Sequence, residues 1–186
     1  MTRRVPIIPT IIVLAAVATM IALGIWQLGR RAEKEALLVS YTAAAGESRV
    51  VPFPIAGDGA DVWFRRSEVY CLSVLSIEPF AGTAATGQKG WVQRASCKVS
   101  EDAAVMVDLG FSRDLANSDW SGGKVSGVIA PGPRLVADPP QAGLQPLAKP
   151  DPGDLPNNHL AYAGQWFFFA LTALVIYVLA LKRRRR

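Results

Sequence analysis

Two long uncharged stretches, one near each end of the chain, stand out in the pattern of hydrophobic and polar positions. Residues 7–28 and residues 160–181 contain no Asp, Glu, Lys or Arg. Each stretch has about 22 residues, and at about 1.5 Å per helical residue it crosses a hydrocarbon core of about 30 Å. We therefore expect two transmembrane helices. The region between them is expected to form one exported domain.

Basic residues near the ends of these stretches predict the orientation of the chain. Cytoplasmic flanks of transmembrane helices carry an excess of Lys and Arg. The terminal sides hold Arg3, Arg4, Lys182 and residues 183–186, whereas the loop side of the first stretch holds Arg30, Arg31 and Lys34. We expect both termini in the cytoplasm, residues between the spans in the periplasm, and the protein in a bacterial inner membrane.

The N-terminal stretch has a second interpretation, a cleaved signal peptide. Arg3-Arg4 resembles an n-region, residues 7–15 an h-region, and Ala16-Val17-Ala18 a small-residue cleavage site. The apolar run continues through Trp26, however, which a short h-region does not need. We favour a retained span, and with so few residues before it we do not expect a mitochondrial transit peptide.

The residue pattern changes twice between the spans. Residues 29–46 are rich in helix formers and end at a glycine, so we expect the first helix to extend beyond the membrane until Pro52 and Pro54 break it. Short runs of strand formers follow, bounded by Gly, Pro, Ser or Asp, at residues 69–75, 90–97, 103–107 and 124–129. We expect a small antiparallel β domain of about five to seven strands.

Prolines are concentrated in residues 131–158, which we expect to form an extended return to the membrane. The predicted fold class is membrane α + β, with two transmembrane helices flanking one small antiparallel β domain. The predicted divisions are a cytoplasmic N-terminus 1–6, a first span 7–28, a helical extension 29–46, a β domain 47–130, a proline-rich return 131–158, a second span 159–181 and a basic tail 182–186.

The charged residues and the two cysteines argue against several functions but do not indicate one. The net charge of +5 equals the charge of the basic tail, so it indicates topology rather than nucleic-acid binding. Glu78, Asp102, Asp108 and Asp114 read as solvated surface carboxylates, and the protein is not expected to be an enzyme. Cys71 and Cys97 fall on predicted strands of the exported region, where both a disulfide and two buried thiols are compatible with the sequence.

His159 is the only histidine of the chain and lies at the mouth of the second span. A neutral imidazole is able to ligate a metal or heme iron there, whereas a packing role against the first helix is the alternative. At helical spacing His159 shares a face with Tyr162, Ala163, Trp166 and Ala170. Gly24 in the first span lets another helix or a flat ligand approach the backbone closely.

The two ends of the chain resemble a known family. Gly24-Ile25-Trp26-Gln27-Leu28-Gly29-Arg30 and residues 158–167, Asn-His-Leu-Ala-Tyr-Ala-Gly-Gln-Trp-Phe, are similar to the two most characteristic stretches of the Surfeit locus protein 1 family of cytochrome c oxidase assembly factors. Residues 90–92 and 105–111 look like weaker forms of its central strand motifs. The chain departs from the family at Glu33-Lys34, where a Trp-Lys pair is usual, and at Leu109, where an Arg is usual.

The resemblance implies a function in heme handling. It implies that heme a is bound at the outer membrane interface with His159 as the iron ligand, and is then inserted into cytochrome c oxidase subunit I. Trp26, Tyr162 and Trp166 are expected to flank the macrocycle and Arg30 to meet its propionates, although the aromatics also fit a headgroup belt and the arginine also fits phospholipid contact. Expected partners are subunit I, heme a synthase and the lipid bilayer. The alternative is a scaffold that stabilises an oxidase assembly intermediate without binding heme.

Overall fold

A computed structural model describes residues 6–115 and 118–185, so Arg3, Arg4 and Arg186 of the orientation prediction lie outside the described residues. The chain forms two compact units. One unit contains the helical segments 6–37 and 156–185, and the other is the β unit Leu38–Leu155. The two units are described separately below.

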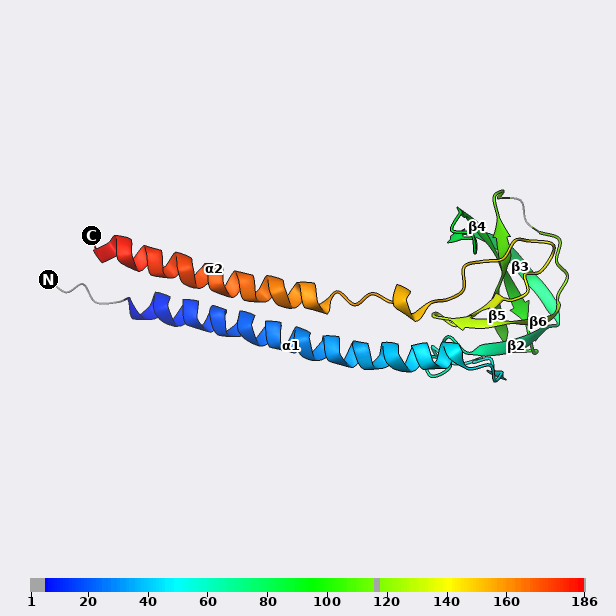
Figure 1. Ribbon diagram of the computed structural model, residues 1–186, viewed down its shortest axis with the longest axis horizontal. Helices are drawn as coiled ribbons and strands as arrows, with labels where there is room; N and C mark the ends of the chain where they lie inside the picture. The colour runs from blue at the N-terminus through cyan, green and yellow to red at the C-terminus, as the bar shows by residue number, and fades with distance from the viewer. Residues whose placement is uncertain (1–5, 116–117, 186) are drawn as a thin grey trace. The chain divides into compact units, whose positions relative to one another are not determined.

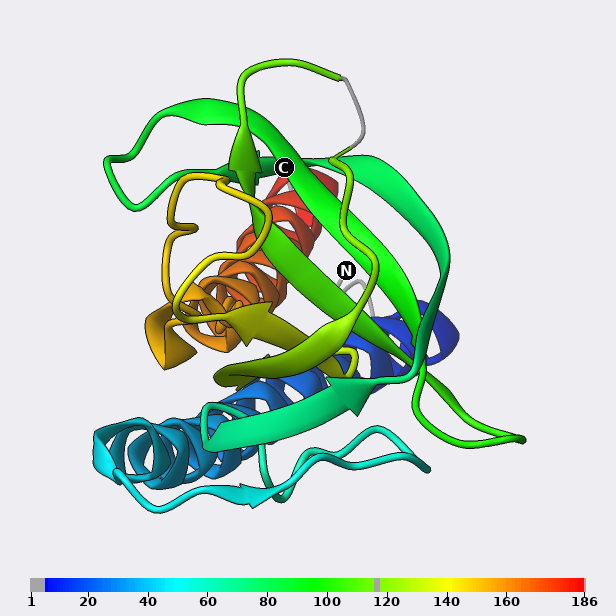
Figure 2. The ribbon, with the colours of Figure 1, turned by 90° about the vertical axis from the view of Figure 1, so that its right-hand side faces the viewer.

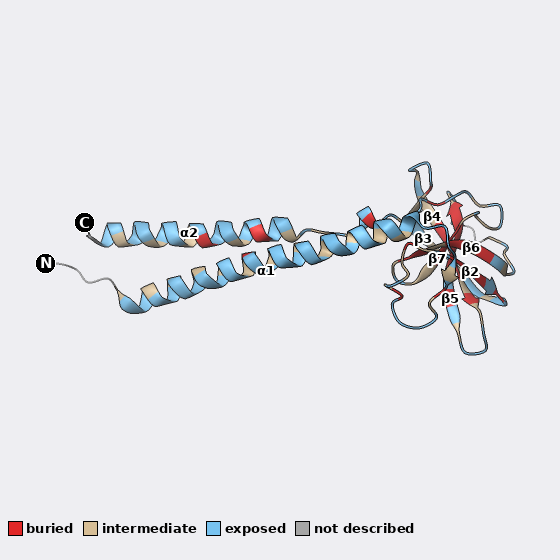
Figure 3. Ribbon diagram, turned by 60° about the horizontal axis from the view of Figure 1, so that its bottom comes forward, coloured by how far each residue is buried: buried red, intermediate tan, exposed pale blue. Residues whose placement is uncertain are grey.

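Two helices dominate the chain: α1 (Ile7–Gly46) and α2 (His159–Arg185). Both are long and apolar enough to cross a membrane. Within their unit the two helices run side by side in opposite directions (Figure 1). Most of their large apolar side chains are exposed, as the pale blue ribbons of Figure 3 show, which is the pattern expected of a lipid-facing surface.

The last turns of α1 belong to the β unit. Tyr41 packs against the rings of Trp63 and Phe64, with centroid distances of 5.8 and 5.3 Å. Directly after the helix, Glu47 forms an ion pair with Arg65 at 2.6 Å. These contacts fix the end of α1 against the segment that leads into the sheet.

The β unit contains one seven-stranded sheet with the order β1-β2-β6-β7-β5-β4-β3. Four of its strand pairs are antiparallel, whereas β1 with β2 and β5 with β7 are parallel. The sheet is therefore mostly antiparallel, as predicted, with two exceptions. Its strands are β1 (Val51–Pro52), β2 (Arg66–Cys71), β3 (Ser73–Thr83), β4 (Lys89–Lys98), β5 (Ala104–Ser112), β6 (Gly123–Ala130) and β7 (Arg134–Ala137).

The sheet curls strongly without closing. Only Leu72 connects β2 to β3, yet four other strands separate them in the sheet order. The two ends of the sheet must therefore approach each other, and Figure 2 shows the strands wrapping around. Leu72 N donates a hydrogen bond of 2.8 Å to Lys98 O, and a disulfide joins Cys71 to Cys97 at the same place, with 5.2 Å between the Cα atoms.

The hydrophobic core lies on the inner face of this curled sheet. Strands β2, β4 and β6 show alternating burial over much of their length, because successive side chains of a strand point to opposite faces. The core contains Phe53, Val69, Cys71, Ala95, Cys97, Val105, Val107, Leu109, Val125, Ile129, Leu135 and Ala137. A second, smaller cluster of buried side chains contains Ala84, Val92, Phe111, Ala130, Val136 and Leu147.

Three sequence expectations differ from the structure. The predicted strand at residues 69–75 is the end of β2 and the start of β3, separated at Leu72. The predicted domain boundary at residue 130 falls inside the sheet, since β7 pairs with both β5 and β6. Asp108 was expected on the solvated surface but is only 3% exposed, because two arginines enclose its carboxylate.

Candidate functional site at the helix pair

Each helix presents one stripe of less exposed residues to the other. The spacing of three or four positions places a stripe on one helical face. On α1 it contains Thr10, Val13, Val17, Met20, Gly24, Gln27 and Arg31, and on α2 it contains His159, Ala163, Trp166, Ala170, Ala173, Tyr177 and Leu181. The side-chain hydroxyls of Thr10 and Tyr177 form a hydrogen bond near the ends of the pair that contain residue 7 and residue 185.

The ring of Phe167 on α2 lies directly against the backbone of α1 at Gly24. A Cβ atom at this position would lie 2.6 Å from the nearest ring carbon of Phe167, which is far inside van der Waals contact. Of the two occupants that the sequence left open, a neighbouring helix occupies this space. The predicted flat ligand is therefore not placed against the Gly24 backbone in this arrangement.

His159 is the first residue of α2, and its ring contacts α1 through one hydrogen bond. The Nδ1 atom of His159 lies 2.7 Å from Oε1 of Gln27. An amide oxygen only accepts hydrogen bonds, so this contact is a hydrogen bond in the tautomer that carries the proton on Nδ1. In that tautomer the lone pair is on Nε2, and no hydrogen bond to Nε2 is found among the described residues. This is the arrangement of histidines that bind metals, whose second ring nitrogen is oriented by an outer hydrogen bond.

The other predicted site residues differ in their exposure and in whether they lie at the contact between the two helices. Trp166 lies on the contact stripe, with its ring edge-on to Phe169 at a centroid distance of 6.4 Å. Tyr162 and Trp26 are 49% and 56% exposed and lie outside the stripe of less exposed residues. Arg30 forms an exposed ion pair with Glu33, so this departure from the usual family motif provides the arginine with a partner.

The β unit contributes no metal cluster to the site. Among the described residues, no group of three or more His, Cys, Asp or Glu side chains is placed to hold a metal ion. Cys71 and Cys97 are bonded to each other, so neither is a free thiol.

Comparison with known proteins identifies the family. A family model described as the SURF1 family matches residues 14–171, which is most of the chain. The chain belongs to the SURF1 family. The matched range includes both helix motifs and both central strand motifs on which the sequence resemblance rests, so that resemblance is confirmed.

SURF1 proteins are associated with cytochrome c oxidase assembly and form a family of assembly factors rather than of catalysts. No curated protein matches the chain. The SURF1 assignment fits the arrangement described above, in which the only histidine of the chain is the first residue of α2 and contacts α1.

Gln27 is the residue that sequence reasoning missed in this SURF1 protein. It lies inside the quoted motif of residues 24–30, three positions after Gly24 and therefore on the same helical face. That spacing was the available signal. The pairing with His159 itself depends on the antiparallel register of two helices that are more than a hundred residues apart in sequence, which the sequence does not reveal.

Proposed function

We propose that this protein is a cytochrome c oxidase assembly factor that binds heme a through His159 and assists its insertion into oxidase subunit I. The observation that carries the proposal is the hydrogen bond from His159 Nδ1 to Gln27 Oε1, at 2.7 Å, which leaves Nε2 as the coordinating atom. Heme iron accepts an axial imidazole nitrogen, and the helix pair offers an amphipathic macrocycle an apolar surface beside it. The donor present therefore fits the group.

Other side chains near His159 are assigned supporting roles in the proposal. Trp26, Tyr162 and Trp166 flank the macrocycle and exclude water from it, because aromatic rings are amphipathic at the membrane interface. Arg30 meets the propionates. Its ion pair with Glu33 is exposed on both sides, 51% and 62%, and an exposed pair is worth little, so it exchanges readily for another carboxylate.

The proposed setting is a bacterial inner membrane, with both termini in the cytoplasm and the β unit in the periplasm. Basic residues Lys182, Arg183 and Arg184 at the end of α2 support this orientation. The Cys71–Cys97 disulfide supports it as well, since disulfides persist in oxidising compartments. Subunit I and heme a synthase are the proposed partners, as acceptor and source of the heme.

The test is an absorption spectrum of the full chain, purified in detergent from cells that make heme a. We expect a heme a band in the wild type and its loss in His159→Ala. Gln27→Leu is expected to weaken heme binding by about 10- to 100-fold, because outer hydrogen bonds orient a ligating imidazole. Gln27→Glu, which keeps an acceptor, should retain the band.

The matched control is Tyr177→Phe, which removes the Thr10–Tyr177 hydrogen bond between the helices without touching His159. It should retain the band, and a loss would mean that helix pairing rather than imidazole orientation governs heme binding. A band that survives His159→Ala in a membrane-inserted protein would overturn the ligand assignment. The absence of a band in every form, with subunit I still captured, would favour the scaffold alternative.

A further inference from the structure

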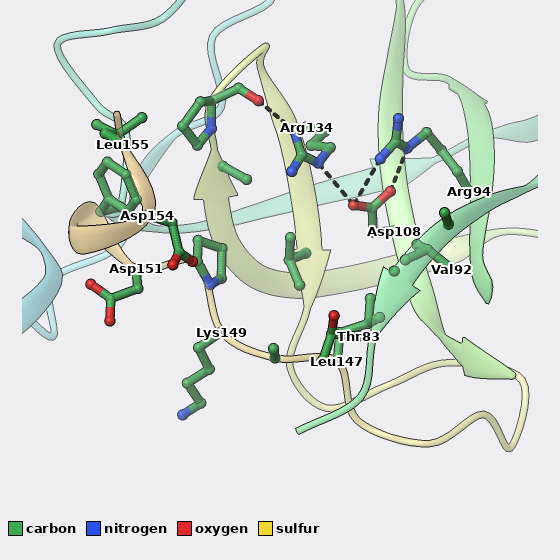
Figure 4. A pocket seen from close by; sticks show the side chains of 18 residues that line it. Thr83, Val92, Arg94, Asp108, Arg134, Leu147, Lys149, Asp151, Asp154 and Leu155 are labelled. Atoms are coloured by element: carbon green, nitrogen blue, oxygen red, sulfur yellow. Dashed lines mark hydrogen bonds and ion pairs between the residues drawn. The ribbon is translucent and has the colours of Figure 1, made fainter. Parts of the chain in front are cut away.

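The β unit contains a cavity of about 290 Å³ that the heme proposal does not use (Figure 4). Its walls come from the end of β3, from β4 and β5, from the β6–β7 connection, and from the returning segment that includes the 3₁₀ helix η1 (Pro152–Asp154). Apolar side chains form a large part of the lining: Phe64, Val92, Ala130, Val136, Leu147 and Leu155. Its volume is close to the lower limit of typical small-ligand pockets.

One end of the cavity is formed by a carboxylate held between two arginines. Asp108 accepts hydrogen bonds from Nε of Arg94 at 2.5 Å, from Nη2 of Arg94 at 3.2 Å and from Nε of Arg134 at 2.9 Å. Arg134 also donates through Nη1 to Pro131 O. The guanidinium of Arg94 is further fixed over the Phe80 ring, 4.4 Å from its centroid.

The two arginines have N–H donors and positive charge in addition to those that bind Asp108 and Pro131. Nη1 of Arg94 and Nη2 of Arg134 have no hydrogen-bond partner among the described residues. Two guanidinium groups face one carboxylate, so one positive charge is uncompensated. Glu78 lies opposite Arg94 in the strand register, but no ion pair joins these two described residues.

Two of the remaining charged groups that line the cavity, Lys149 and Asp151, have partners of their own. Lys149 forms an ion pair with Asp138 at 3.4 Å, and an Asp151 oxygen accepts the backbone N–H of Gly153. Figure 4 shows Lys149, Asp151 and Asp154 on the side of the cavity away from the Arg94–Asp108–Arg134 group. The cavity therefore has a cationic end, apolar walls and a separate acidic mouth.

We propose that this cavity binds a carboxylate carried on a short, branched apolar body. The free N–H groups of the two arginines receive the carboxylate, because guanidinium matches carboxylate geometry and charge-assisted hydrogen bonds are strong. The apolar lining takes the branched body. If Arg94, Asp108 and Arg134 only linked β4, β5 and β7, the N–H groups that bind Asp108 and Pro131 would be sufficient. The remaining N–H groups are therefore available to a ligand.

A carboxylate of this kind is found both at the C-terminus of a peptide and in a small organic acid. Three compounds distinguish these two sources. N-acetyl-L-leucine, its neutral amide and 4-methylpentanoate are titrated into the isotope-labelled full chain in neutral detergent micelles, and backbone amide shifts are recorded. We expect N-acetyl-L-leucine to shift the amides of Arg94, Arg134 and Ala148, and the neutral amide to bind at least about tenfold more weakly. Tighter binding of N-acetyl-L-leucine than of 4-methylpentanoate assigns a peptide chain end, and equal binding assigns an organic acid.

Two variants test which cation receives the carboxylate. Arg134→Lys keeps the charge beside Asp108 but loses the planar fork, and it should weaken N-acetyl-L-leucine binding by about tenfold or more with the β-unit spectrum preserved. Lys149→Ala, the matched control, should leave binding unchanged. The proposal is overturned if neither carboxylate shifts the cavity amides, if the neutral amide binds as tightly as the acid, or if Lys149→Ala and not Arg134→Lys removes binding.

Discussion

Removal of the Cys71–Cys97 disulfide should cost the β unit a large share of its stability. The two cysteines are 26 positions apart, and the loop-entropy relation gives about 3.5 kcal/mol for a link of this separation. Both residues are buried, at 2% and 0% exposure, so replacement by Ala rather than Ser avoids leaving a polar group in the core. For a domain of this size the loss corresponds to a melting temperature lower by about 10–20 °C.

Hydrogen exchange of the full chain in detergent, followed by mass spectrometry, measures this loss within the sheet. Peptides from β4 and β5, in which many residues are buried, report global opening of the β unit. A change of about 3.5 kcal/mol predicts exchange several hundredfold faster in the double Ala variant.

Wild-type protein reduced under native conditions is the control, because it keeps both sulfur atoms and loses only the link. It should lose nearly as much stability as the double variant. A loss below about 1 kcal/mol in the reduced protein would refute the loop-entropy reasoning and attribute the remainder to packing. A change confined to α1 and α2 peptides would also contradict it, since the link lies wholly within the β unit.

Two further predictions concern the helix pair and the sheet surface. Gly24→Leu should separate the helices, because its Cβ would overlap the Phe167 ring and overpacking costs about 1–3 kcal/mol. Gly29→Leu is the control, because the space around Gly29 is open. Distances between spin labels on α1 and α2 should increase only in Gly24→Leu, and equal distances in both variants would contradict the packing. The hydrogen bond from Lys124 holds the pKa of Glu68 below its ordinary value. The resulting stabilisation is present above the unfolded-state pKa, about 4.3, and is lost as the pH falls through the lower folded-state pKa. Lys124→Met should raise the pKa of Glu68 in a carboxyl NMR titration, and an unchanged titration would exclude this cause.

The sequence predicts the large elements of the fold well, because their signals are local. Uncharged runs of sufficient length mark both helices, and strand formers mark most of β4 and β6 and the first part of β5. Two strands gave no such signal. β1 has only two residues, one of them Pro52, and β7 has four residues just after Pro131-Gly132-Pro133. Both exist because neighbouring strands offer them hydrogen bonds, which is a property of the tertiary structure.

The candidate site is predictable only to the extent that single residues reveal it. His159 stands out as the only histidine beside an apolar run. Its partner Gln27 does not, because the contact requires the register between two distant helices. Asp108 resembles any other surface carboxylate in sequence, and its burial depends on arginines from β4 and β7 that converge only in the curled sheet.

The order of strands in the sheet has a consequence for how the protein emerges during synthesis. β2 pairs with β6, and the register joins Arg66 to Val128, so at about 5–20 residues per second β2 waits several seconds for its partner. β4 follows β3 directly, and the register of that hairpin places Cys97 opposite Val74, three positions from Cys71. Oxidation of this early hairpin therefore holds the end of β2 in place before β6 exists. We expect the disulfide to hold β2 near β3 and β4 until β6 has been synthesised. This shortens the time during which the unpaired edge of β2 is available for aggregation.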